Sequence, residues 1–374
     1  MKIAPLIKAI QEWNELTNER SLIQYRLVHT GQHYDKNMSD TFFEELGIPA
    51  PDVNLGCGGG SQAEQTAAIM VAFEKELMAH PTDVVLVVGD VTSTMACSIV
   101  AKKLNTKVCH VEAGIRSWDL TMPEEINRMV TDSLADYMFT TSDVANANLV
   151  RMGNEMNKNV WFVGNVMIDT LMANRARFRK PQVWDELGLK EKEYIVMTMH
   201  RPGNVDEESH LKAMMEQIID NVHGLPVIFP IHPRTALRLR ELLNERSQTS
   251  SMSATESLND ANKWANLHIV EPMGYLEFNY LVERAKAVVT DSGGITEETT
   301  VMGVPCITLR DNTERPETCT VGTNELIGTD PKAIKPALDK LFAGEWKKGA
   351  IPELWDGHAA ERIVKILADL GDRR

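Results

Sequence analysis

The sequence predicts an α/β protein made of two doubly wound domains. Short apolar runs alternate with longer segments of helical spacing along the 374 residues, and the 43% of apolar residues can fill two cores. Uninterrupted apolar runs are typical of strands that are buried on both faces of a parallel sheet. The expected strands fall in two series, at residues 84–88, 108–111, 137–140 and 161–163, and at residues 194–197, 227–230, 267–270, 287–289 and 304–309.

A polar stretch at residues 175–191 separates the two series and marks the domain junction. We therefore expect a first domain at residues 1–172 and a second at residues 173–355, followed by a helix at residues 356–374 that packs back toward the first domain. Residues 247–262, rich in Ser, Thr and Asn, are expected to form a loop. Because doubly wound folds bind ligands at the carboxyl ends of their strands, we expect the two domains to face a common cleft.

Composition and charge argue against several classes of partner. The 39 Lys and Arg residues against 53 Asp and Glu residues give a net charge of -14, which does not support a nucleic-acid or anionic-membrane partner. The five Cys residues lack the spacing of a zinc site or of a disulfide framework, so we expect a cytoplasmic protein. No run approaches the roughly 20 apolar residues that span a bilayer. We expect neither a metal nor a nicotinamide cofactor.

The turn at residues 290–298 predicts a nucleotide site. It follows an apolar run and precedes a helical segment, so Ser292, Gly293 and Gly294 lie between a strand and the start of a helix. Adjacent glycines let a phosphate approach the backbone, and the helix end attracts its charge. Glu297 and Glu298 lie one turn later, and a carboxylate there can accept hydrogen bonds from the hydroxyls of a ribose.

Three carboxylates of the first domain lie where acid and base chemistry is expected. Asp90 and Glu112 each end an expected strand, and Glu124 follows a proline four residues before Arg128. Neighbouring carboxylates that differ in burial can act as acid and base on a sugar. Asp90 could instead cap a helix, and Glu124 could belong to an ordinary helix start. Glu112 has no obvious capping role.

Polar loops of the second domain add basic groups. Residues 198–204 follow a strand and bring His200 and Arg201 toward the expected cleft, where both could meet a diphosphate. A surface arginine and a histidine satisfied in the core are the ordinary alternatives. Residues 230–234 repeat the pattern with lower specificity, and residues 310–316 form a polar loop that could close over a phosphate or a base, or be an ordinary charged loop.

Taken together, these segments resemble the non-hydrolysing UDP-N-acetylglucosamine 2-epimerases. The resemblance covers nearly the whole chain in the same order, and it implies a glycosyltransferase-B-type fold, a homodimer and the interconversion of UDP-GlcNAc and UDP-ManNAc. The motifs that carry it are Thr-Gly-Gln-His at residues 30–33, Gly-Asp at 89–90, His-Val-Glu-Ala-Gly at 110–114, Pro-Glu-Glu-Ile-Asn-Arg at 123–128, Val-Gly-Asn at 163–165 with Ile-Asp at 168–169, and the segments 198–204, 291–298 and 313–316.

The resemblance also implies roles for particular residues. The reaction eliminates UDP across C1 and C2 to give 2-acetamidoglucal and then adds it back with the proton on the other face of C2. Asp90, Glu112 and Glu124 are the acid-base candidates, with the face that each serves left open. Arg128 and His200 would stabilise the leaving diphosphate. The UDP-binding residues would be Lys2, His200, Arg201, Ser292, Gly293, Gly294, Glu298 and Arg315.

The sequence departs from the family pattern near its start. The usual first strand and Gly-Thr-Arg-Pro-Glu loop are absent, and Lys2 matches the lysine that follows that loop. The loss of such a strand is expected to leave neighbouring strands unpaired. We hypothesise that the start is assigned too late, the alternative being an impaired variant.

A second departure bears on substrate and regulation. Asp35 stands where relatives regulated by UDP-GlcNAc often have glutamine, so a regulatory site that includes Gln32 and His33 is in question. Epimerases of UDP-2,3-diacetamido-glucuronate share this feature, which keeps the substrate open. A hydrolysing epimerase, a UDP-sugar glycosyltransferase and a UDP-binding protein without turnover remain alternatives.

Overall fold

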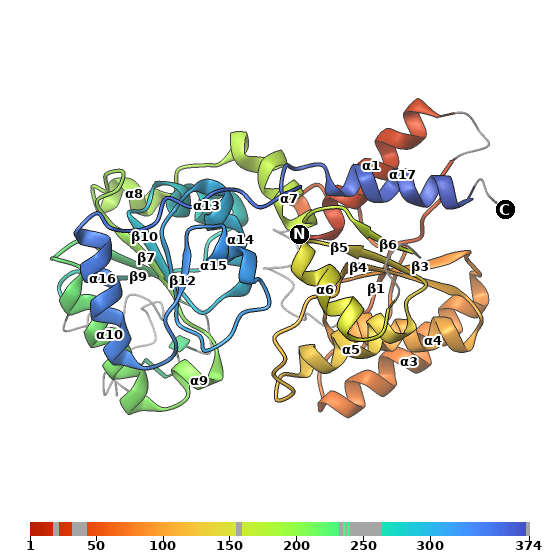
Figure 1. Cartoon of the computed structure of the whole chain (residues 1–374), viewed down its shortest axis with the longest axis horizontal. Coiled ribbons are helices and arrows are strands. Elements are labelled where there is room, and N and C mark those ends of the chain that lie inside the picture. The colour runs from red at the N-terminus through yellow and green to blue at the C-terminus, as the bar shows by residue number, and fades with distance from the viewer. Residues whose placement is uncertain are drawn as a thin grey trace, which may run out of the picture. The chain divides into compact units, whose positions relative to one another are not determined.

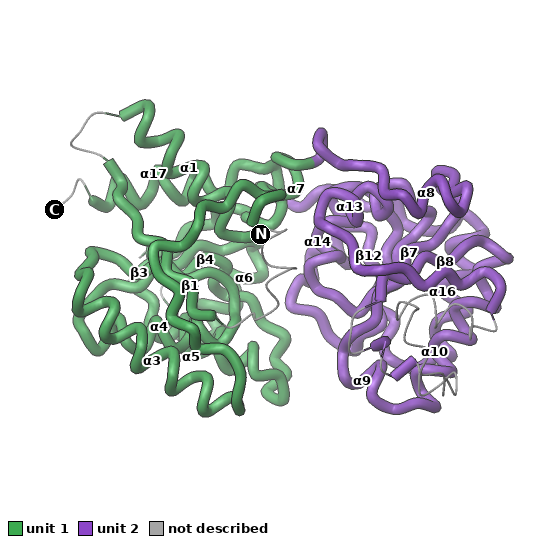
Figure 2. The backbone as a smooth tube through the Cα atoms, turned by 180° about the vertical axis from the view of Figure 1, so that it is seen from behind, with its two compact units in different colours: residues 1–174, 353–374 green, residues 175–352 purple. Residues whose placement is uncertain are grey.

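The structure, a computed structural model, describes residues 1–17, 22–31, 43–154, 159–231, 235–236, 238–239 and 264–371. The chain divides into two compact units, unit 1 with Met1–Asn174 and Glu353–Arg374 and unit 2 with Arg175–Pro352 (Figure 2). Each unit holds a parallel sheet with helices around it, which confirms the predicted α/β class. Gln32, His33 and the expected loop at residues 247–262 lie outside the described residues.

Unit 1 is built on a four-stranded parallel sheet in the order β3-β4-β5-β6 (Figure 1). Helices α3 and α4 pack on one face of the sheet, and α1 and α17 pack on the other. The strands are β3 (Val84–Val88), β4 (Lys107–Ala113), β5 (Tyr137–Thr140) and β6 (Val160–Phe162). The helices are α1 (Ile3–Leu16), α3 (Gln62–Ala79), α4 (Thr92–Lys103), α5 (Pro123–Leu134), α6 (Asp143–Arg151), α7 (Val166–Asn174) and α17 (Ala359–Gly371).

Strand β3 lies at an edge of this sheet although all five of its residues are apolar. In the part of the chain that the structure describes, β3 forms a ladder with β4 alone. Two further strands, β1 (Val28–His29) and β2 (Val53–Asn54), pair with each other in a separate parallel ladder. Val28 nevertheless packs against the same apolar cluster as Val85 and Val87 of β3.

Unit 2 has a six-stranded parallel sheet in the order β12-β11-β10-β7-β8-β9. The chain runs outward from β7 through β8 to β9 and then returns to β10 on the other side of β7. This reversal is a topological switch point, where open α/β sheets bind ligands outside the carboxyl ends of the strands. The strands are β7 (Ile195–Thr198), β8 (Val227–Pro230), β9 (Leu267–Val270), β10 (Ala287–Thr290), β11 (Cys306–Thr308) and β12 (Asn324–Leu326).

Helices of unit 2 cover both faces of its sheet. The largest apolar cluster joins α10 and α16 to the central strands, and a second cluster joins α13 to the opposite face. The helices are α8 (Gln182–Glu186), α9 (Pro202–Val205), α10 (Glu208–Asn221), α13 (Tyr275–Arg284), α14 (Gly293–Met302), α15 (Pro316–Thr320) and α16 (Ile334–Phe342). Helix α14 starts directly after β10, at the switch point.

The C-terminal segment is tied back onto unit 1 by capping and by close backbone packing. Asp169 of α7 accepts hydrogen bonds from the backbone N–H of Ala359, at 3.1 Å, and of Ala360, at 2.6 Å, and so caps the start of α17. Gly164 lies under the returning chain with a φ of +94°, and a Cβ there would be 2.0 Å from the carbonyl oxygen of Leu354.

Replacing Gly164 by Ala should therefore destabilise unit 1 strongly. The left-handed backbone and the overlap with Leu354 together should lower the free energy of unfolding by roughly 2 to 4 kcal/mol. Gly188→Ala is the matched control, because Gly188 has a φ of +59° and no atom within 4 Å of its Cβ position. Denaturant unfolding measures both variants, and equal losses would show that the contact with Leu354 contributes nothing.

In the described ranges no helix is long and apolar enough to cross a membrane.

Candidate active site

Glu112 ends β4 in a strained conformation. Its φ is +73°, and the pairing of β4 with β5 shifts register between Val111 and Ala113. A bulge re-aims the side chain, and a non-glycine residue in this region costs of order 1–3 kcal/mol, which is characteristic of functional positions. The Glu112 carboxylate is nearly buried, and its Oε2 lies 2.6 Å from Nζ of Lys2. The two side chains therefore form a close ion pair.

A buried ionic network supports the strand ends around Glu112. His110 has Nδ1 2.6 Å from Asp132 Oδ1 and Nε2 2.8 Å from the carbonyl oxygen of Gly89. The other oxygen of Asp132 accepts hydrogen bonds from the Gly114 N–H and from Arg116. Burial raises the pKa of Asp132, but His110 and Arg116 outweigh this effect and hold it below its usual range. The network thus holds the backbone at Gly89, next to Asp90, and at Gly114, which follows Glu112 and Ala113.

Asp90, after β3, is held by helix α5. Arg128 donates to Asp90 Oδ2 from Nη2 at 2.5 Å and from Nε at 2.9 Å, and Asn127 donates to the Asp90 carbonyl oxygen. Arg128 also donates to Glu125 at 2.7 Å. The structure thus joins Asp90 and Arg128, which the sequence placed on different elements.

Glu124 and Glu125 have opposite surroundings at the start of α5. Glu125 is buried and accepts hydrogen bonds from the backbone N–H of Ser117 and Trp118 as well as from Arg128. Glu124 is exposed. The spacing of Glu124 and Arg128 predicted a shared helical face, but Glu125, three residues before Arg128, is the residue that turns inward beside it. Glu125 has a structural role, and Glu124 is accessible.

In unit 2, Asp291 links the loop after β7 to the turn after β10. Its fully buried carboxylate accepts hydrogen bonds from the backbone N–H of His200 and Arg201 and from the side chain of Asn204, at 2.9 to 3.2 Å. Nδ1 of His200 lies 2.7 Å from Asp291 Oδ1, and the imidazole is 43% exposed. Burial raises the pKa of Asp291, but these hydrogen bonds keep it below its usual range. The carboxylate therefore fixes the orientation of the His200 ring through Nδ1.

The turn after β10 has the geometry of an anion site. Ser292 is the N-cap of α14, and its side chain makes no capping hydrogen bond. Its backbone N–H donates to the hydroxyl of Thr290 at 3.0 Å. Gly293 and Gly294 open the helix, and a Cβ on Gly293 would lie 3.6 Å from Arg310 Nη1. The helix end and this guanidinium both favour a phosphate.

Two carboxylates of α14 lie one turn further and have different partners. Glu297 pairs with Arg315. Glu298 accepts a hydrogen bond from the hydroxyl of Tyr275 on α13 at 2.7 Å. Burial raises the pKa of Glu298 to about 7, against the lowering effect of that hydroxyl. Tyr275 was not singled out from the sequence, because its role depends on the packing of α13 against α14.

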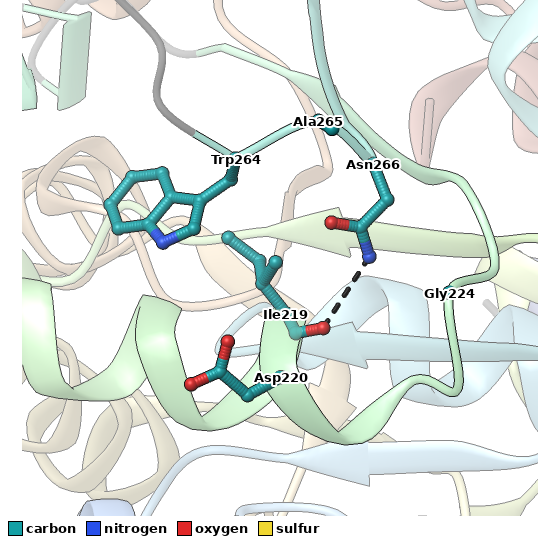
Figure 3. Close-up of a pocket in the computed structure, with 6 residues that line it drawn as sticks. All are labelled: Ile219, Asp220, Gly224, Trp264, Ala265 and Asn266. Carbon is teal, nitrogen blue, oxygen red and sulfur yellow. Dashed lines mark hydrogen bonds between the residues drawn. The ribbon is translucent and has the colours of Figure 1, made fainter.

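A shallow hollow of unit 2 lies at the amino ends of strands β8 and β9. Its lining comes from the end of α10 and from the residues that precede β8 and β9, whereas the turns after β7 and β10 lie at the carboxyl ends of the strands. Asp220 is the one carboxylate among the lining residues (Figure 3). The lining consists of Ile219, Asp220, Gly224, Trp264, Ala265 and Asn266. This hollow offers no acid-base pair and no anion site.

Comparison with known proteins identifies the family. A model of the UDP-N-acetylglucosamine 2-epimerase family matches residues 15–368. The chain belongs to this family. It is 39% identical to the UDP-N-acetylglucosamine 2-epimerase of Methanocaldococcus jannaschii over 381 residues, which cover 98% of this chain and 95% of that protein. It is also 36% identical over 359 residues to the UDP-2,3-diacetamido-2,3-dideoxy-D-glucuronate 2-epimerase of Pseudomonas aeruginosa, covering 94% of this chain and 93% of that protein.

Solved structures of the 2-epimerase family share the fold. The crystal structure of the M. jannaschii enzyme in complex with UDP-GlcNAc and UDP superposes on this chain with a TM-score of 0.83 at 38% sequence identity. The match covers 98% of this chain and 96% of the M. jannaschii chain. This agreement confirms the glycosyltransferase-B-type class that the family resemblance implied.

The candidate residues gather in two groups, one in each unit. Unit 1 holds Asp90, Glu112, Glu124 and Arg128 at the carboxyl ends of β3 and β4 and at the start of α5, together with Lys2 at Glu112. Among the candidates that the structure describes, unit 2 holds His200, Arg201, Ser292, Gly293, Gly294, Glu298 and Arg315. Among the described residues, no group of three or more His, Cys, Asp or Glu side chains is arranged to hold a metal ion.

Proposed function

We propose that this 2-epimerase interconverts UDP-GlcNAc and UDP-ManNAc without hydrolysis, by elimination and re-addition of UDP. The observation that carries the proposal is the strained, nearly buried Glu112 paired with Lys2 in a chain that also has an anion-binding turn at a switch point. The relative of known structure that is bound to UDP-GlcNAc and UDP supports the same ligand.

Unit 2 holds the nucleotide in this proposal. The N-terminal end of α14, with Ser292, Gly293 and Gly294, receives the diphosphate, and His200 and Arg201 stabilise its charge as the C1–O bond breaks. Glu298 accepts hydrogen bonds from the ribose hydroxyls, and Arg315 supports this carboxylate pair through Glu297. These groups retain UDP while the sugar is detached.

Unit 1 supplies the acid-base groups. A carboxylate removes the proton from C2, the electron pair forms the C1–C2 double bond, and UDP leaves with the glycosidic oxygen. In the return step, an acid donates a proton to the other face of C2 while the UDP oxygen bonds to C1. No net oxidation occurs, so the reaction needs no redox cofactor. Asp90, Glu112 and Glu124 share these proton transfers, and Arg128 holds Asp90 in place.

Lys2 has a role at Glu112 in this mechanism. Its ammonium, 2.6 Å from the carboxylate, holds the Glu112 side chain in a fixed position for the proton transfer. This role is compatible with the UDP contact that the family resemblance implies.

We further propose that the epimerase is a cytoplasmic homodimer. Analytical ultracentrifugation of the full chain tests the oligomeric state.

Product analysis tests the proposal. The protein is incubated with UDP-GlcNAc and, separately, with UDP-2,3-diacetamido-glucuronate, and the products are identified by NMR. UDP-ManNAc from the first substrate is the expected result. Free ManNAc with UDP would indicate a hydrolysing epimerase, and transfer that requires an acceptor would indicate a glycosyltransferase. Epimerisation of the glucuronate alone would assign the activity of the P. aeruginosa relative.

The pH dependence of nucleoside binding tests the role of Glu298. Its pKa of about 7 favours the protonated carboxyl below that pH, and the ionised carboxylate is the stronger acceptor for ribose hydroxyls. Affinity for uridine should therefore rise as pH increases through about 7 and then level off. Uridine is the probe because it lacks phosphates that titrate in this range. Calorimetry across pH measures the effect, and Glu298→Gln should give weaker binding with a flat profile; a flat wild-type profile would refute the role.

A further inference from the structure

A carboxylate lies at the anion site of unit 2, directly in front of α14. Glu314 Oε2 is 2.8 Å from Arg310 Nη1, and Oε1 is 3.8 Å from Arg201 Nη2. The Cβ position of Gly293 is 3.9 Å from the same Glu314 Oε2. The Glu314 side chain is 10% exposed, and that of Arg310 is 3% exposed. The carboxylate is thus enclosed between two guanidiniums at the start of a helix.

The groups around Glu314 are those that would bind a phosphate. A guanidinium presents its donors to a carboxylate or a phosphate in the same geometry, and a helix N-terminus attracts either anion. Arg201 is also anchored by a bond from Nε to the carbonyl oxygen of Asp291 at 3.0 Å, and Arg310 by a bond to Asn312 at 3.1 Å. Both guanidiniums also contact the Glu314 carboxylate.

Two anions at this place would compete. A diphosphate that approaches Gly293 comes within a few ångströms of Glu314, where like charges repel strongly because little water screens them. Arg201 and Arg310 can direct all of these contacts to the incoming phosphate only when the Glu314 side chain moves away from both guanidiniums.

We propose that Glu314 is a place-holding carboxylate that the diphosphate of the ligand displaces. The inference rests on the proposed function, since it assumes that unit 2 binds UDP. Before binding, Glu314 keeps both arginines oriented and neutralises part of their charge. Because Glu314 competes with the phosphates for both arginines, it lowers the affinity for phosphate-bearing ligands. This competition promotes release of the nucleotide after turnover. Glu314 therefore sets affinity through the phosphates and leaves recognition of the nucleoside unchanged.

Glu314→Gln isolates this effect. The amide keeps the size of the side chain but loses the competing charge, so the affinity for UDP should rise by roughly tenfold while the affinity for uridine stays the same. Asp311→Asn is the matched control, because Asp311 is in the same loop but accepts hydrogen bonds from Thr329. It removes the same unit of charge and should leave both affinities unchanged. Calorimetry at fixed ionic strength measures all of them.

Coupling to Arg310 separates this role from a general charge effect. In an Arg310→Gln background, Glu314→Gln should change UDP affinity far less than in the wild type, and thermal melts should show that each variant is folded. Unchanged or weaker UDP binding in Glu314→Gln, with uridine binding retained, would overturn the inference and leave the nucleotide site standing. Failure of the wild type to bind either ligand would instead refute the proposed function, and this inference with it.

Discussion

Replacing Glu112 by Gln is expected to lower turnover of UDP-GlcNAc by a factor on the order of 10³. The amide fills the same nearly buried space beside Lys2 but cannot accept the C2 proton. The affinity for UDP should stay near that of the wild type, because unit 2 holds the nucleotide in our proposal. Steady-state kinetics and calorimetry with UDP measure the two effects separately.

Two observations would show that the loss comes from chemistry. Glu74→Gln, on the exposed side of α3, is the matched control and should retain full activity. Thermal melting of Glu112→Gln should show a folded protein, since the buried network of His110 and Asp132 is intact in that variant. Turnover of Glu112→Gln within a few-fold of the wild type would remove Glu112 from the proton transfer.

Asp291→Asn should weaken UDP binding by roughly one to two factors of ten, or about 1.4 to 2.8 kcal/mol. The Asp291 carboxylate accepts hydrogen bonds from both backbone N–H groups of the loop that carries His200 and Arg201. An amide offers one acceptor oxygen, and its NH₂ group faces donors. The loop should lose its fixed position, and the His200 ring should lose the partner of Nδ1.

Calorimetry and turnover distinguish positioning from simple loss of fold. Asp291→Asn should raise the KM for UDP-GlcNAc and lower kcat as well, because His200 and Arg201 act on the leaving diphosphate in our mechanism. Asp220→Asn lies in the shallow hollow at the amino ends of β8 and β9 and should change neither KM nor kcat. Unaltered UDP affinity in a folded Asp291→Asn variant would show that the loop keeps its position without this carboxylate.

The sequence predicted the strands and the strand ends well for a clear physical reason. Uninterrupted apolar runs are distinctive, and the glycine pair after residues 287–290 marks the start of α14 where the structure has it. Strands β1, β2 and β12 were not predicted. In β12, Asn324–Leu326 has one apolar residue and no strand periodicity. A three-residue strand at a sheet edge depends on its neighbour β11 more than on its own composition.

Side-chain partners were harder to predict because they depend on packing. The buried face of α5 carries polar residues, among them Glu125, Arg128 and Asp132, so the usual apolar stripe did not mark the inward side. Glu124 and Glu125 are identical in type and adjacent, and the sequence could not tell which one turns inward. The contact of Glu314 with Arg201 joins loops after different strands, which no local pattern reveals.

Incorporation of solvent hydrogen at C2 shows whether epimerisation proceeds by proton transfer at C2 through Glu112. The wild-type epimerase is incubated with UDP-GlcNAc in deuterated water, and the C2 position of the UDP-linked sugars is followed by NMR. We expect deuterium at C2 of UDP-ManNAc with UDP still attached, and no such label with Glu112→Gln. Formation of UDP-ManNAc that retains the original C2 hydrogen would contradict it.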